Sequence, residues 1–166
     1  MNIRQIANLD PRTSMWVEAQ CQANRLTPIQ TEAVAEAVAE QVRRYWRSCN
    51  LDEYGTAIAP PVTWVRSMTM TTIARFINAQ GKHRLEDYVP DTAGSAEYRM
   101  LFDRAEALKS FMPEGYRAAF HLFLIGLGPS EIAHVLEVSR ESVDTAIRGA
   151  INIVRNDITA NHHNLK

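Results

Sequence analysis

Cysteine is scarce in this chain of 166 residues, which holds only Cys21 and Cys49. Neither has another cysteine or a histidine at the spacing that zinc ligands require, so neither a metal site nor a disulfide framework is expected. The two thiols are predicted to be reduced and partly buried, as in a protein of the cytoplasm.

Long apolar runs are also missing. No stretch approaches the roughly 20 consecutive apolar residues that a membrane helix needs, although 46% of the residues are hydrophobic and suffice for small cores. The N-terminal stretch, MNIRQIANLDPRTSM, has no apolar segment of the kind that signal peptides carry. We therefore expect a cytoplasmic protein with no membrane partner.

Motifs that carry catalysis are absent as well. The sequence contains neither a Gly-rich phosphate loop nor a nucleophile motif. The five histidines are His83, His121, His134, His162 and His163. His121 and His134 lie in predicted helices and are expected to be structural rather than metal-binding, and His162 and His163 lie in a polar tail. The sequence therefore predicts a protein that is not an enzyme and needs no cofactor.

The chain does contain a three-helix pattern over residues 113–155. Apolar side chains recur at helical spacing in the first of these helices, namely Tyr116, Ala119, Phe120 and Phe123. A short helix is predicted over residues 129–136, because Pro129 suits a first helical turn. Ser139 is the expected N-cap of the third helix. Two such helices, joined by a three-residue turn and packed on a third, are typical of a helix-turn-helix.

The remainder of the chain is predicted to be helical too. Thr27 and Gln30 have the spacing of a capping box, with Pro28 at the first helical position. The first dozen residues show no pattern and are interpreted as a flexible arm, and residues 50–61 as a loop. Helices are expected over residues 14–25, 28–49, 63–79 and 96–111. The predicted fold class is therefore all-α.

Two small helical domains are expected. The first spans residues 1–84 and includes the flexible N-terminus, and the second, with the helix-turn-helix, spans residues 96–160. Residues 85–95, LEDYVPDTAGS, form the predicted linker, because this stretch is polar, acidic and contains a proline and a glycine.

Positive charge is concentrated in the middle of the chain, although the net charge of the whole is −1. Residues 42–84 contain seven lysines and arginines against two acids, a net charge of +5. Residues 113–166 contain five basic residues against six acids, a net charge of −1. Only the middle segment has the charge expected of a surface that follows a phosphate backbone.

In layout the chain resembles the extracytoplasmic-function sigma factors of the bacterial sigma-70 family, over roughly residues 30–155. The segments RRYWRS and VTWVRSM, followed by a basic end, are similar to region 2 of that family. The segments MPEGYRAAF, SEIAHVL and VSRESV are similar to region 4. The resemblance implies an alternative sigma factor that binds core RNA polymerase and directs it to promoter DNA. It also allows an anti-sigma factor as a partner.

Three sets of site residues follow from that resemblance. The helix over 30–48 would bind polymerase through Glu36, Glu40, Gln41, Arg43, Arg44 and Arg47. The segment 63–84 would contact a −10 element through Arg66, Thr71, Thr72, Arg75, Lys82 and Arg84. The helix over 140–155 would read a −35 element through Arg140, Glu141, Ser142, Thr145, Arg148 and Asn152. The mixed charges of the first set are also those of an ordinary solvated helix face, since acids before bases complement the helix dipole.

Several residues depart from the family pattern. Asp144 and Ala146 stand where a basic residue is usual, and Thr71 and Arg75 replace polar residues near the −10 contacts. The aromatic Trp64 is expected to be a core residue rather than a base-stacking platform.

Two alternatives to a sigma factor therefore stay open. One is a sigma mimic or adaptor that binds polymerase or an anti-sigma partner without reading DNA. The other is a plain dimeric helix-turn-helix regulator, with the N-terminal half as its dimerisation module.

Overall fold

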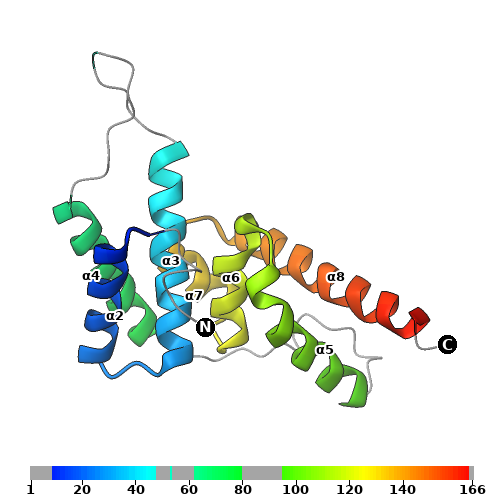
Figure 1. The fold of residues 1–166 in the computed structure, drawn as a ribbon. Helices are drawn as coiled ribbons and strands as arrows, with labels where there is room; N and C mark the ends of the chain where they lie inside the picture. Colours follow the sequence, from blue (N-terminus) through cyan, green and yellow to red (C-terminus); the bar gives the residue numbers. More distant parts are fainter. Residues whose placement is uncertain (1–8, 48–52, 54–61, 80–94, 165–166) are drawn as a thin grey trace. The chain divides into compact units, whose positions relative to one another are not determined.

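The computed structural model describes residues 9–47, 53, 62–79 and 95–164, and all regular elements within these ranges are helical (Figure 1). The prediction of an all-α protein is confirmed for this part of the chain. The chain divides into two compact units, Met1–Asn78 and Ala79–Lys166. Most of the predicted linker and nearly all of the predicted loop over residues 50–61 lie outside the described residues. None of the described helices combines the length and apolar character needed to span a membrane.

The first described helix, α2, spans Pro11–Ala23 and begins earlier than the sequence predicted. Asp10 is its N-cap, because one carboxylate oxygen accepts hydrogen bonds from the backbone N–H groups of Arg12 and Thr13, each at 3.1 Å. The Thr13 hydroxyl bonds to the other oxygen, and these hydrogen bonds lower the pKa of Asp10. The prediction that the first dozen residues form a flexible arm is therefore wrong for Pro11 and Arg12.

Helices α3 (Pro28–Arg47) and α4 (Val62–Asn78) complete the first unit, and the predicted capping box is confirmed. The Thr27 hydroxyl accepts from the Gln30 N–H at 3.2 Å, and the Gln30 side chain accepts from the Thr27 N–H at 2.9 Å. Helices α2, α3 and α4 pack against one another. Their core consists of apolar side chains that include Val17, Val34, Val38, Ile73 and Phe76.

Cys21 lies in this core with no exposed surface, and burial raises the pKa of its thiol to about 11. The thiolate is the reactive form. In a Cys49→Ser chain at pH 8, we expect Cys21 to react with a thiol reagent at least ~100-fold more slowly than in the urea-unfolded chain, given a pKa two units higher. Absorbance at 412 nm with a disulfide reagent measures this rate. Equal rates in the two states would contradict the buried position.

The second unit contains α5 (Ser95–Leu108), a 3₁₀ turn (Lys109–Phe111), α6 (Glu114–Leu124), α7 (Pro129–Leu136) and α8 (Arg140–Asn164). Helix α8 packs against α5, α6 and α7. Buried apolar side chains fill the space between them, among them Leu101, Phe120, Leu122, Ile132, Val135, Ile147 and Val154. Arg104 of α5 and Asp157 of α8 form an ion pair that joins the two helices.

One helical glycine in this unit marks a close approach between helices. Gly149 of α8 lies against the ring of Tyr116 in α6, so a Cβ atom at position 149 would be 2.8 Å from Cζ of that ring. Real Cβ atoms are not found so close to another heavy atom. The absence of a side chain at Gly149 therefore sets how closely α6 and α8 pack.

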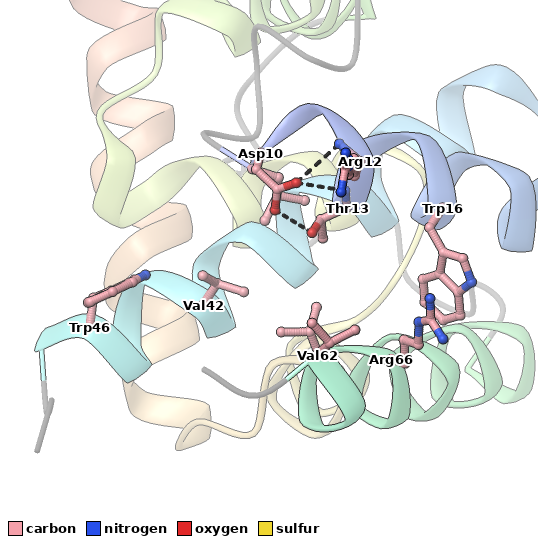
Figure 2. A pocket seen from close by; sticks show the side chains of 10 residues that line it. Asp10, Arg12, Thr13, Trp16, Val42, Trp46, Val62 and Arg66 are labelled. Carbon is pink, nitrogen blue, oxygen red and sulfur yellow. Dashed lines mark hydrogen bonds between the residues drawn. The ribbon is translucent and has the colours of Figure 1, made fainter. Parts of the chain in front are cut away.

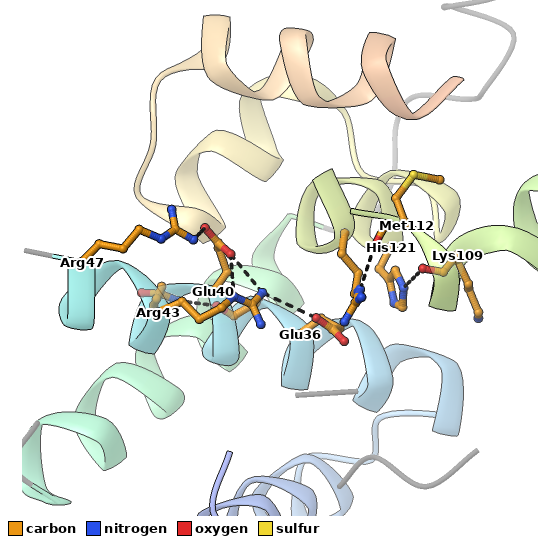
Figure 3. Close-up of polar contacts among 10 residues, drawn as sticks. Glu36, Glu40, Arg43, Arg47, Lys109, Met112 and His121 are labelled. Carbon is orange, nitrogen blue, oxygen red and sulfur yellow. Dashed lines mark hydrogen bonds and ion pairs between the residues drawn. The ribbon is translucent and has the colours of Figure 1, made fainter. Parts of the chain in front are cut away.

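His121 of α6 is a buried titratable group in the same unit, with 3% of its surface exposed. Its Nε2–H donates to the backbone carbonyl of Lys109 at 3.3 Å (Figure 3). Burial lowers the pKa of the imidazole to about 4. The ring is therefore neutral in the native protein at physiological pH.

Candidate nucleic-acid interface

Helices α7 and α8 are joined by the three residues 137–139, as the sequence predicted. Glu137 takes the left-handed conformation (φ 56°) and ends α7, where its N–H bonds to the Ala133 carbonyl. Ser139 then caps α8 by accepting from the Ser142 N–H at 3.1 Å. The predicted bounds of the short helix and the predicted cap are thus both confirmed. The α8 helix ends at Asn164, later than the predicted end at residue 155.

The residues predicted to read a −35 element all lie exposed on α8; they are Arg140, Glu141, Ser142, Thr145, Arg148 and Asn152. Positions 141, 145, 148 and 152 differ by four, seven and eleven residues, so they share one face of the helix. Ser142 lies beside that face, and its hydroxyl bonds to the Ser139 hydroxyl at 2.8 Å. Ser142 therefore serves the helix cap in this structure.

The electrostatics of this face are nearly balanced. Arg140 and Asp144 form an ion pair at 3.9 Å, one helical turn apart. Glu141 adds a second acid, so over residues 140–152 two arginines are matched by two acids. Phosphate neutralisation supplies most of the non-specific affinity for DNA, and this surface offers little of it. Ala146, where the resemblance suggested a basic residue, is only 7% exposed and belongs to the core beneath the face.

The second predicted set lies partly outside the described residues, since Lys82 and Arg84 are not among them. Of the rest, Arg66 and Thr71 are exposed and Arg75 is half-buried. Thr71 and Arg75 are one turn apart on α4, whereas Arg66 lies on a different side of that helix. The structure therefore does not bring Arg66 together with the other two.

Thr72, also predicted as a −10 contact, is 1% exposed, and for this residue the prediction of a surface site is wrong. Its hydroxyl donates to the Met68 carbonyl at 2.8 Å and accepts from the Gln41 side chain at 2.9 Å. Gln41, predicted to bind polymerase, is likewise buried at 6% exposure. Together they satisfy each other's polar groups between α3 and α4, as buried polar groups must.

The remaining residues predicted to bind polymerase lie on α3, and four of them, Glu36, Glu40, Arg43 and Arg47, are paired with one another (Figure 3). Arg43 forms an ion pair with Glu40 at 2.9 Å and lies 3.8 Å from Glu36. Arg47 is 58% exposed and contacts Glu40 at 3.4 Å, while Arg44 is half-buried. Glu36 has no exposed side-chain surface, so it does not belong to an exposed face.

Two aromatic side chains of the first unit, Trp64 and Trp46, are exposed to solvent, although the sequence predicted that Trp64 is buried. Trp64 is 36% exposed, and its ring lies 5.0 Å from that of Tyr45. Trp46 is 41% exposed and meets Tyr45 edge to face at 6.4 Å. The expectation that Trp64 is a core residue is wrong, whereas Phe76 is buried.

A cavity of about 560 Å³ in the first unit was not anticipated (Figure 2). Its lining comes from α2 and the two residues before it, from α3 and from α4, and includes Arg12, Trp16, Trp46 and Arg66. The Asp10–Pro11 start of α2 could have indicated that this region is ordered. That a cavity forms there depends on how three helices meet, which no local pattern encodes. No group of three potential metal ligands occurs among the described side chains.

No family model, curated protein or solved structure matches this chain. The residues and their arrangement are therefore the basis on which a function can be proposed.

Proposed function

We propose that this protein is a cytoplasmic transcription regulator that contacts promoter DNA through α8 and acts with core RNA polymerase as an alternative sigma factor. The observation that carries the proposal is the α7–α8 pair. A short helix, a three-residue turn and a capped second helix place Glu141, Thr145, Arg148 and Asn152 on one exposed face. In helix-turn-helix proteins this is the part that enters the major groove.

The side chains of that face suit base edges. Arg148 can donate two hydrogen bonds to guanine, and Asn152 can pair with adenine. Thr145 can contact a thymine methyl, and Glu141 can accept from the cytosine amino group. The near-balance of charge means that sequence-specific contacts, rather than phosphate contacts, have to supply the affinity. Polymerase, which binds DNA itself, would supply the remainder.

The first unit supports the polymerase part of the proposal. Its exposed Arg47 and the neighbouring Glu40–Arg43 ion pair form a mixed-charge end of α3 of the kind that a protein partner can complement. Of the residues predicted to contact promoter DNA from α4, Arg66 and Thr71 are exposed, on different sides of that helix.

Transcription in vitro tests the proposal most directly. Core RNA polymerase mixed with this protein is expected to start transcripts at defined positions on genomic DNA fragments, whereas core enzyme alone is not. Binding to core polymerase without any specific transcript would reject the sigma-factor role. A palindromic footprint made by a dimer in the absence of polymerase would point to a plain helix-turn-helix regulator.

Arg148 provides a residue-level prediction. Arg148→Ala is expected to weaken binding to the target promoter by about 1–3 kcal/mol if the guanidinium reads a guanine. Arg148→Lys is the matched variant, because it keeps the charge but lacks the planar fork. Both variants should therefore bind the cognate site weakly, as measured by fluorescence anisotropy. If Arg148→Lys binds like the parent protein, the contact is to phosphate and not to a base.

A sigma mimic is the second candidate, and the Arg140–Asp144 ion pair favours it. That pair engages Arg140, one of the two arginines predicted to contact a −35 element, and so weakens the attraction of this arginine for a polyanion. A mimic would bind core polymerase or an anti-sigma partner and show no affinity for any promoter fragment, even at low salt. Binding that appears at low salt and is specific for sequence would exclude the mimic.

A further inference from the structure

The cavity in the first unit has an apolar floor and aromatic walls. Val42 of α3 and Val62 and Val65 of α4 supply the floor. Figure 2 shows the indole rings of Trp16 and Trp46 on opposite sides, with Val42 and Val62 between them. A volume of about 560 Å³ lies within the range of small-molecule sites.

Two cations, Arg12 and Arg66, border the cavity. No carboxylate among the described residues forms an ion pair with the guanidinium of Arg12 or Arg66. The one acid in the lining, Asp10, is engaged by the N-terminus of α2, where its oxygens accept from two backbone N–H groups and one hydroxyl. The cavity thus presents two guanidinium groups that can bind an anion, whereas the carboxylate of Asp10 is already hydrogen-bonded to the start of α2.

The side chain of Arg66 is positioned at the cavity by a contact with Trp16. Its guanidinium lies over the ring of Trp16, with 5.5 Å from Cζ to the ring centroid (Figure 2). Such a cation–π contact orients the group while leaving its N–H donors unused. The cavity therefore combines aromatic rings, a positioned guanidinium group and apolar valine side chains.

We propose that this cavity binds a small planar organic anion, an aromatic ring system that carries a carboxylate, sulfonate or phosphate group. The ring would lie between Trp16 and Trp46 above the valine floor, and the acidic group would accept hydrogen bonds from Arg12 and Arg66. The site lies wholly in the first unit and requires neither DNA nor polymerase. An experiment on this site therefore tests it separately from the role proposed for α8.

Titration of the full chain with 8-anilinonaphthalene-1-sulfonate, an aromatic anion with a planar naphthalene ring system, tests this site. We expect binding of one probe per chain, with energy transfer from tryptophan to the probe, because two tryptophans line the cavity. N-phenyl-1-naphthylamine has the same rings without the sulfonate. It should bind about tenfold more weakly, since charge-assisted hydrogen bonds would be lost.

Substitutions locate the binding. Arg66→Gln and Arg12→Gln should each weaken binding of the sulfonate about tenfold and leave binding of the neutral probe unchanged. Arg148→Gln, in the other unit, is the matched control and should change neither. Circular dichroism verifies that each variant folds, and Arg12 is exposed on α2, so its variant tests the site even if Arg66→Gln unfolds. Equal affinities for the two probes, or equal losses in Arg12→Gln and Arg148→Gln, would overturn the proposal.

Discussion

Lowering the pH from 7 to 4 is expected to reduce the free energy of unfolding of the second unit by up to about 3 kcal/mol through His121 alone. Burial lowers the pKa of His121 to about 4 in the folded protein, against an ordinary value of 6.5. Each unit of pKa difference corresponds to about 1.4 kcal/mol. Nearby Lys109 and Arg117 further disfavour the charged imidazole.

The sign follows from proton uptake. Below pH 6.5 the unfolded chain protonates His121, whereas the folded chain leaves it neutral until the pH approaches 4. The unfolded state thus binds more protons in this window, so stability falls as the pH falls. Above pH 6.5 both states are neutral and the contribution of His121 no longer changes.

Urea unfolding at a series of pH values measures the effect. All three tryptophans of the chain belong to the first unit, so their fluorescence follows that unit, and far-UV circular dichroism adds the second. His121→Gln keeps a neutral donor for the Lys109 carbonyl and should flatten the dependence between pH 6.5 and 4. His134→Gln removes an exposed histidine from α7 and is the matched control. A His121→Gln profile as steep as that of the parent would show that other groups cause the acid sensitivity.

Two chemically identical substitutions, Gly149→Ala and Gly115→Ala, are expected to differ by about 3 kcal/mol in their effect on stability. Replacing a helical glycine by alanine ordinarily stabilises a helix by up to about 1 kcal/mol. At Gly149 the new methyl group would be 2.8–3.1 Å from atoms of the Tyr116 ring. Because overpacking typically costs about 1–3 kcal/mol, the sign should reverse there.

Gly115 is the matched control, because a methyl group at that position of α6 meets no atom within 4 Å. Thermal unfolding followed by circular dichroism compares the two variants. Combining Gly149→Ala with Tyr116→Leu should recover part of the lost stability, since a smaller side chain leaves room for the methyl group. If Gly149→Ala is as stable as Gly115→Ala, the contact between α6 and α8 is looser than the structure indicates.

Local signals in the sequence were sufficient for the helix boundaries that depend on caps. The Thr27–Gln30 capping box and the Ser139 cap act between residues three positions apart, so they can be read without knowledge of the fold. The start of α2 was missed although Asp10 precedes a proline. That cap is followed by a helix with little amphipathic character, so periodicity gave no support to it.

The buried hydrogen bond between Gln41 and Thr72 could not be predicted from local sequence patterns. Gln41 and Thr72 are 31 residues apart, and each would be an ordinary surface residue on an isolated helix. Only the packing of α3 on α4 turns them toward each other. A periodic pattern assigns polar residues to the outside by default, and it fails where two of them satisfy each other inside.

The candidate DNA-binding face was easier to predict than the surface of the first unit. On α8, the buried positions Val143, Ile147, Ala150 and Ile151 define one side, and the polar positions follow from helical geometry. On α4, in contrast, Trp64 is apolar and yet exposed. Composition favours burial of such a residue, and its exposure depends on neighbours that lie far away in the sequence.

Helix α8 is long enough to connect its exposed face to the ion pair that it forms with α5. One continuous helix of 25 residues carries Arg148 at its ninth position and Asp157, the partner of Arg104 in α5, at its eighteenth. At about 1.5 Å per residue, such a helix is a rod nearly 40 Å long. Because a helix transmits a tilt along its axis without bending much, a partner that displaces α5 would swing the exposed face of α8 as well. Displacement of α8 at Asp157 would thus alter the angle of the face that is proposed to contact DNA.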